Sequence, residues 1–99
     1  MKYTVTVRAR LREAPAVAKA YHDQLTRATK DAAKRAGDLT HAVYLDPQDP
    51  QAFFGVDTWS SLEGIQSFAG SPQIREFFAK LFDGEPEVRV WMDSDWNQW

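Results

Sequence analysis

The spacing of apolar residues switches between two periods along this chain of 99 residues, and the order of the switches limits the fold. Residues 3–11, YTVTVRARL, carry an apolar side chain at every second position, which is the pattern of a half-buried strand. Residues 15–37 instead repeat apolar side chains every three or four positions, as an amphipathic helix does. The chain therefore combines strands and helices within the length of a single domain.

The first predicted helix begins near Pro15 and ends at Gly37, because glycine commonly terminates helices. Its predicted buried stripe follows spacings of four, four, three, four and four: Val17, Tyr21, Leu25, Ala28, Ala32 and Ala36. His22 lies at the edge of this stripe and is predicted to be at the surface.

Two strands follow, over about residues 39–45 and 52–59. They are separated by the sequence DPQDP at 46–50, a predicted turn because two prolines and two aspartates do not continue a ladder. Ser60 is expected to cap the next helix, with Glu63 completing a capping box.

The sequence GSP at residues 70–72 interrupts this helix, and Ser71 is expected to cap a second piece that ends at Gly84. A last strand covers about residues 87–92, followed by a polar tail at 93–99. The order β-α-β-β-α-β predicts a ferredoxin-like α+β protomer with a four-stranded antiparallel sheet, spanning residues 1–99 as one domain.

The predicted strands have one nearly apolar face and one mixed face. The apolar face, which we expect to carry the helices, consists of Val5, Val7, Ala9, Val43, Leu45, Phe54, Val56, Val88 and Val90. The mixed face consists of Thr4, Thr6, Arg8, Arg10, Tyr44, Phe53, Asp57, Trp59, Arg89 and Trp91. Aromatic residues beside arginines are typical of interfaces, so we expect this face to form a two-fold homodimer. The alternative is a monomer whose tail, with Trp96 and Trp99, folds back over it.

Several motifs between residues 39 and 92 resemble the antibiotic biosynthesis monooxygenase-like family. They are the turn DPQDPQAFF, the strand end VDTWSS, the segment FAGSPQIREFF and the final GEPEVRVW. The resemblance implies a dimeric α+β barrel with a pocket between each sheet and its own helices. It also implies oxidation of flat aromatic or quinol molecules by oxygen, without a flavin or a bound metal.

Two positions differ from the family pattern. Many members carry a histidine nine residues after the strand-end tryptophan, where this chain has Phe68. The haem-degrading branch has an asparagine on the first strand, whereas this strand contains none. The resemblance therefore does not extend to haem degradation.

The candidate site follows from the expected pocket. His41 is the only ionisable side chain on the predicted apolar face and is the candidate general base, or else a hydrogen-bonded structural residue. The pocket is predicted to be lined by Tyr21, Phe54, Trp59, Phe68 and Phe78. Trp59 could instead belong to the interface, since it shares parity with Phe53. Asp57 is expected to pair with arginines across the mixed face.

Composition and motif spacing argue against a metal-binding, nucleic-acid-binding or membrane-spanning protein. No cysteine is present, the two histidines are nineteen residues apart, and DSDWN at the tail is not continued as a calcium loop, so no metal site is predicted. The basic excess of the first half lies mostly on one helix among acidic residues, so nucleic acid is not an expected partner. No apolar run approaches the ~20 residues of a membrane span, and without a secretory signal we expect a cytoplasmic protein.

Three functions remain open from the sequence. The first is a cofactor-independent oxygenase acting on a small aromatic or quinol-type molecule, with His41 as the base. The second is a non-catalytic dimer that binds a ligand or serves as a stress-related accessory protein, which Phe68 favours. The third is an isomerase or lyase on the same fold.

Overall fold

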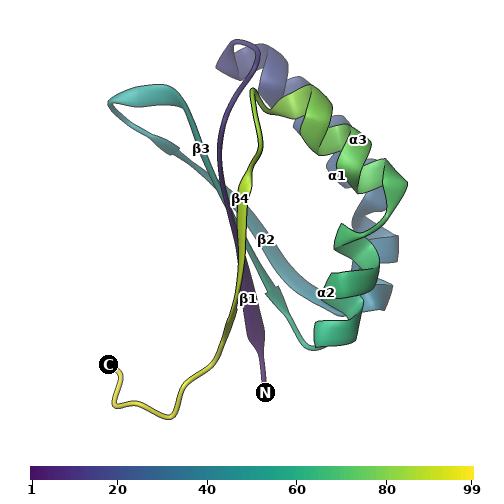
Figure 1. Cartoon of the computed structure of the whole chain (residues 1–99), viewed down its shortest axis with the longest axis vertical. Coiled ribbons are helices and arrows are strands. Elements are labelled where there is room, and N and C mark those ends of the chain that lie inside the picture. Colours follow the sequence, from purple (N-terminus) through teal and green to yellow (C-terminus); the bar gives the residue numbers. More distant parts are fainter.

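The computed structural model describes residues 1–99 and contains one sheet covered on one face by helices (Figure 1). In chain order the elements are β1 (Tyr3–Arg10), α1 (Pro15–Ala36), β2 (Asp38–Asp46), β3 (Asp49–Trp59), α2 (Leu62–Ala69), α3 (Pro72–Leu81) and β4 (Glu87–Met92). The strands are all antiparallel and lie in the order β2-β3-β1-β4. This is the predicted ferredoxin-like arrangement, and its β-α-β-β-α-β order with a divided second helix is confirmed.

Local chemistry explains where the helices end. Gly37 follows α1 with a φ of 112°, a left-handed conformation that glycine adopts without strain. Ser71 accepts a hydrogen bond from the backbone N–H of Ile74, and Pro72 occupies the first turn of α3, as predicted. The cap of α2 was misplaced by one residue: Ser61, not Ser60, accepts from the N–H of Gly64. The third helical position is consequently Gly64, so Glu63 cannot complete a capping box.

The hairpin between β2 and β3 is tighter than predicted. Its turn contains only Pro47 and Gln48, because β2 runs to Asp46 and β3 begins at Asp49. The Asp46 carboxylate accepts from the Gln48 N–H at 2.8 Å, which satisfies the turn backbone. Pro50 is compatible with a strand here because β3 extends beyond its ladder with β1, which ends at the pair Arg10–Ala52.

The predicted faces are correct for β1, β2 and β4 but wrong for β3. Antiparallel partners share a face, and the register pairs Val5 with Asp57 and Ala9 with Phe53. Phe53, Asp57 and Trp59 therefore face the helices, whereas Phe54 and Val56 lie on the mixed face. The alternation of β3 is ambiguous because Phe53 and Phe54 are adjacent, and an error of one residue moves every side chain to the opposite face.

The buried stripe of α1 is also rotated from its predicted position. Val17 is 56% exposed and Ala28 and Ala32 are exposed, whereas Ala18 and Ala33 are buried. The inward residues include Ala18, Tyr21, His22, Leu25, Thr26, Thr29, Ala33 and Ala36. The predicted series that starts at Val17 and the observed series that starts at Ala18 both have spacings of three and four, and both contain Leu25 and Ala36. Periodicity alone therefore could not distinguish them. His22 consequently points inward, which corrects its predicted surface position.

The densest part of the core lies at one end of the layer between helices and sheet. Its buried members are Leu11, Ala18, Phe53, Phe77, Leu81 and Phe82. Arg12 closes this end by donating from its guanidinium to the carbonyl oxygen of Phe82 at 2.9 Å. Tight packing at one end leaves the middle of the layer free to enclose a cavity.

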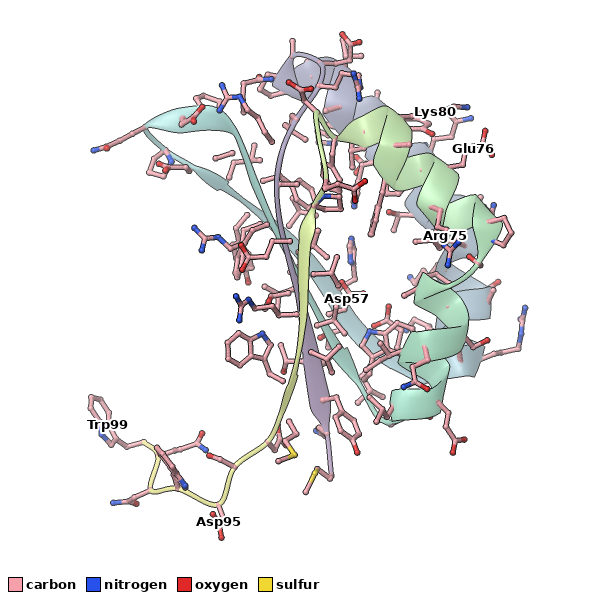
Figure 2. All side chains as sticks on the ribbon, viewed as in Figure 1. Asp57, Arg75, Glu76, Lys80, Asp95 and Trp99 are labelled. Atoms are coloured by element: carbon pink, nitrogen blue, oxygen red, sulfur yellow. The ribbon has the colours of Figure 1, made fainter.

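The C-terminal tail does not cover the mixed face. It continues from β4 away from the sheet, and Trp99 lies at its far end (Figure 2). Trp96 is 80% exposed, and Trp91, on the mixed face itself, is 51% exposed. The alternative of a tail folded back over that face is therefore not what the structure shows.

The contact between α2 and the end of α1 gives a first testable prediction. A Cβ atom at Gly64 would lie 1.9 Å from the carbonyl oxygen of Ala36, so one backbone must move. We expect Gly64→Ala to lower the free energy of unfolding by about 1–3 kcal/mol in a denaturant titration. Ser67→Ala, at an exposed position of the same helix, is the control. Equal stability of the two variants would contradict the close approach.

Candidate functional site

A cavity of about 420 Å³ lies between the sheet and the three helices. Val5, Val7, Gly55 and Val88 form its floor on the sheet, in the centre of the predicted apolar face. Each of the three helices also contributes lining residues, so the cavity depends on the complete fold rather than on one motif. Its size lies within the roughly 300–1,000 Å³ of small-molecule sites.

One wall of the cavity is aromatic and aliphatic. Trp59, at the end of β3, is 3% exposed, and its ring centroid lies 5.6 Å from that of Phe68 on α2. Ile65 on α2 and Phe77 and Phe78 on α3 continue this wall. Because these α2 and α3 residues carry no charge, this side offers shape and dryness to a ligand.

Another wall carries His22, His41 and Asp57 in one hydrogen-bonded row, which continues from His22 to Asp23 outside the lining of the cavity. His41 Nδ1, on β2, lies 2.8 Å from Asp57 Oδ1 on the neighbouring β3, and Figure 2 shows Asp57 on the helix side of the sheet. His41 Nε2 lies 2.9 Å from His22 Nε2, on α1. His22 Nδ1 in turn lies 3.0 Å from Asp23 Oδ1. The row therefore runs from the sheet to the first helix.

These contacts change the ionisation of the row. The hydrogen bond that His41 donates to the Asp57 carboxylate raises the pKa of His41, an effect that burial only partly opposes. Hydrogen bonds from Lys19 and, less strongly, His22 lower the pKa of Asp23 to about 2. Asp57 thus stabilises the imidazolium form of His41 whenever it accepts a proton, whereas Asp23 remains an anion.

A third carboxyl group, Asp38, stands beside Asp57 at the start of β2. Burial is the main cause that raises the pKa of Asp38 to about 8, and the neighbouring Asp57 adds to it. Its Oδ1 atom is buried without a hydrogen-bond partner. Asp38 is therefore protonated at neutral pH, next to a group that serves as the acceptor for His41.

The structure brings together only part of the predicted site. His41, Trp59, Phe68 and Phe78 all line the cavity, and Trp59 lies on the cavity side, not at the interface. Tyr21 instead packs in the core against Phe77, with ring centroids 5.3 Å apart. Phe54 is wrong as a pocket residue, because the β3 register turns it to the mixed face.

The polar residues of the site that sequence reasoning missed include three ionisable groups near His41: His22, Asp38 and Asp57. The rotated stripe of α1 hid His22, and the reversed alternation of β3 placed Asp57 on the wrong face. The series Ala18, His22, Leu25, Thr29, Ala33 was the available signal for His22. No local pattern pointed to Asp38, since the burial that raises its pKa is tertiary.

The mixed face keeps most of its predicted members. Arg8, Arg10, Tyr44, Arg89 and Trp91 lie on it, whereas Phe53 and Asp57 do not. Its arginines therefore find other partners: Arg10 pairs with Asp49 at 3.0 Å and Arg89 with Glu87 at 2.7 Å. Trp91 donates from its indole N–H to the Thr6 hydroxyl at 2.9 Å, which fixes the ring against the strands.

Two further features bear on ligands and membranes. No group of three or more histidine or acidic side chains is arranged to hold a metal ion. None of the three helices combines the length and hydropathy needed to cross a bilayer.

Comparison with known proteins assigns the chain to a family. The sequence model described as antibiotic biosynthesis monooxygenase matches residues 4–80, from β1 into α3. The chain belongs to this family. The match includes all of the cavity-lining residues except Phe82 and Val88, so nearly all of the site lies within the part of the chain that the family model matches. None of the curated proteins compared with the chain matches it.

Several solved structures share the fold of this chain. A cofactor-independent oxygenase from Streptomyces nogalater, SnoaB, is 13% identical with a TM-score of 0.74, covering 95% of this chain and 94% of its own. A conserved protein from Methanosarcina mazei is 14% identical with a TM-score of 0.72, covering 95% and 94%. Rv0793 from Mycobacterium tuberculosis is 17% identical with a TM-score of 0.66, covering 99% and 100%. At these identities the likeness shows the shared fold alone.

The protonated Asp38 of this family member gives a prediction about pH. The folded protein keeps a proton on Asp38 up to about pH 8, whereas the unfolded chain releases it above about pH 3.8. The free energy of unfolding therefore decreases as the pH rises from about 3.8 to about 8. Asp38→Asn removes this titration. We expect it to raise the stability by about 1 kcal/mol near pH 8, after allowance for solvent screening, and hardly at pH 4.

Thermal melting between pH 4 and 9 measures the effect. Asp31→Asn removes a carboxylate from an exposed position of α1 and serves as the control. A gain for Asp38→Asn that is equal at every pH would show that Asp38 is not protonated in the fold.

Proposed function

We propose that this protein is a cofactor-independent oxygenase that acts on a small aromatic or quinol-type molecule bound between the sheet and the helices. One observation carries the proposal: a cavity with an aromatic wall of Trp59 and Phe68 faces an imidazole, His41, that is already hydrogen-bonded to a carboxylate. Membership of the antibiotic biosynthesis monooxygenase family supports the same reaction class.

The residues have distinct roles in this proposal. A flat ligand lies against the aromatic wall, and its hydroxyl group faces His41. His41 accepts the hydroxyl proton, and Asp57 stabilises the imidazolium that results. The apolar surroundings exclude water from the electron-rich anion left on the ligand, which is the species that reacts with oxygen. The protein supplies position, a base and dryness.

The catalytic role of His41 is tested by oxygen consumption with a panel of quinols and hydroxylated polycyclic aromatics. We expect His41→Ala to lower turnover by about 100-fold or more, because general-base groups contribute about 10²–10⁴. Stability should change much less, since His41 is 35% exposed. Unchanged turnover in a folded variant would remove His41 from the mechanism.

Phe68 favours a second function, a non-catalytic ligand-binding or accessory protein. It occupies the aromatic wall at the position where the family resemblance leads one to expect a histidine, and its contact with Trp59 makes this wall wholly apolar. Native mass spectrometry distinguishes the two functions when combined with oxygen measurements. A bound aromatic molecule that is released unchanged, with no oxygen consumed, would favour the binding protein. Conversion without oxygen would favour an isomerase or lyase.

We also propose that two copies associate through the mixed face. Tyr44, Phe54 and Trp91 expose aromatic surface there, beside Arg8 and Arg89, on a sheet face that no helix covers. Exposed apolar patches rimmed by charge are typical of interaction sites. A second copy would supply a matching patch by two-fold symmetry.

Substitution of a single exposed tryptophan tests this association. Trp91→Glu places a charge in the middle of the aromatic patch, so we expect the molecular mass from light scattering to fall from dimer to monomer. Trp96→Glu introduces the same charge in the tail, away from the sheet, and should leave the dimer intact. A dimer that survives Trp91→Glu would place the interface elsewhere.

A further inference from the structure

The row of polar groups on the cavity wall requires more protons than its neutral members carry. It contains three contacts in sequence: Asp57 with His41, His41 with His22, and His22 with Asp23, at 2.8, 2.9 and 3.0 Å. Each contact is short enough for a hydrogen bond and therefore needs one proton. Two neutral imidazoles provide only two, because each carries a single N–H.

Every neutral arrangement leaves one contact without a proton. If both rings donate from Nδ1 to their carboxylates, the two Nε2 lone pairs face each other at 2.9 Å. If one ring donates from Nε2 instead, its bare Nδ1 faces a carboxylate oxygen. One additional proton satisfies all three contacts at once.

The geometry of the two rings suits a shared proton. Their planes differ by only 19°, and their centroids lie 5.1 Å apart with the Nε2 atoms at 2.9 Å, so both nitrogens lie close to the line between the two rings and face each other. The Thr26 hydroxyl also approaches His22 Nε2, but at 3.3 Å it is too long for a strong competing bond. Thr26 lines the cavity, so the meeting point of the two nitrogens is reached from inside it.

We propose that His22 and His41 act as a single proton acceptor, which holds one proton between the two Nε2 atoms and takes it from the hydroxyl group of the ligand. The ligand part of this inference rests on the function proposed above. The O–H bond of the ligand breaks, its electron pair stays on oxygen, and one N–H bond forms on the pair. The charge of the pair changes from zero to +1, and the ligand becomes an anion.

His41 contacts the ligand, and His22 is a positioning residue that acts through His41. The side chain of His41 is 35% exposed, whereas that of His22 is only 15% exposed. Removing the lone-pair repulsion makes the first protonation of the pair more favourable than that of an isolated histidine. A second proton would place two N–H groups and two positive charges in contact, so it binds far less readily.

The surroundings reinforce the single positive charge. Asp57 from β3 and Asp23 from α1 flank the pair, with protonated Asp38 from β2 behind Asp57 and Lys19 outside Asp23. Lys30 and Lys34 are the other charged groups of the cavity wall, and both lie further along α1. The lining residues of β1, β4, α2 and α3 are uncharged.

Imidazole NMR of ¹⁵N-labelled protein between pH 4 and 10 tests the shared proton without any substrate. The chain has only two histidines, so every imidazole signal belongs to this pair. We expect the signals of both rings to change together in a first step, and a second protonation to occur only at clearly lower pH. Independent titration of both rings near the ordinary value would overturn the proposal.

Variants identify the origin of the first step. In His22→Gln, His41 should titrate once, at lower pH than the first step of the wild type. If that variant does not fold, Asp23→Asn should shift the first step downward by removing the outer acceptor, and Asp31→Asn, on the same helix, should not. Shifts of both Nε2 signals on addition of one equivalent of Zn²⁺, reversed by chelation, would instead indicate a metal site and overturn the proposal.

Turnover links the pair to the reaction. With a substrate found in the oxygen panel, the rate should rise through the first pKa of the pair, and His22→Gln should move this limb to lower pH and reduce kcat by about tenfold or more. An unchanged pH profile in His22→Gln would overturn the pair while leaving His41 as the base. A shared proton seen by NMR without oxygen consumption would support the pair and contradict the proposed oxygenase.

Discussion

The alternation of β3 is the constraint on which the rest of the site depends. This strand lies between β1 and β2, so its register with both neighbours fixes which of its side chains face the helices. With Phe53, Asp57 and Trp59 on that side, one strand provides a core residue, the carboxylate partner of His41 and an aromatic wall. A shift of one residue would replace all three at once.

One end of the helix layer is packed more tightly than its middle. Near Phe82 the side chains pack closely, and hydrophobic burial there holds the helices against the sheet. In the middle, Gly55 and three valines leave space above the strands instead of filling it. Phe53, Phe77 and Phe82 belong both to the packed core and to the cavity lining, so the two regions adjoin. The more open middle allows the cavity wall to carry polar groups that a tightly packed core would exclude.

The polar wall joins groups whose ionisation is interdependent. Asp57 raises the pKa of His41, whereas burial, with a smaller contribution from Asp57, keeps Asp38 protonated. The contact between the two imidazoles extends this dependence to α1 and Asp23. A proton accepted at any one of these groups changes the preferred state of the others, as expected for coupled titrations.

The sequence by itself determined the order of elements, the caps at Gly37 and Ser71, the break between α2 and α3 and the family resemblance, because each depends on local chemistry or periodicity. It also indicated His41, Trp59, Phe68 and Phe78 as cavity residues. It could not decide between two helical series on α1, or between adjacent phenylalanines on β3. Only the tertiary structure decided these, because strand register and helix rotation are set by packing between distant segments, and that packing brings His22 to His41.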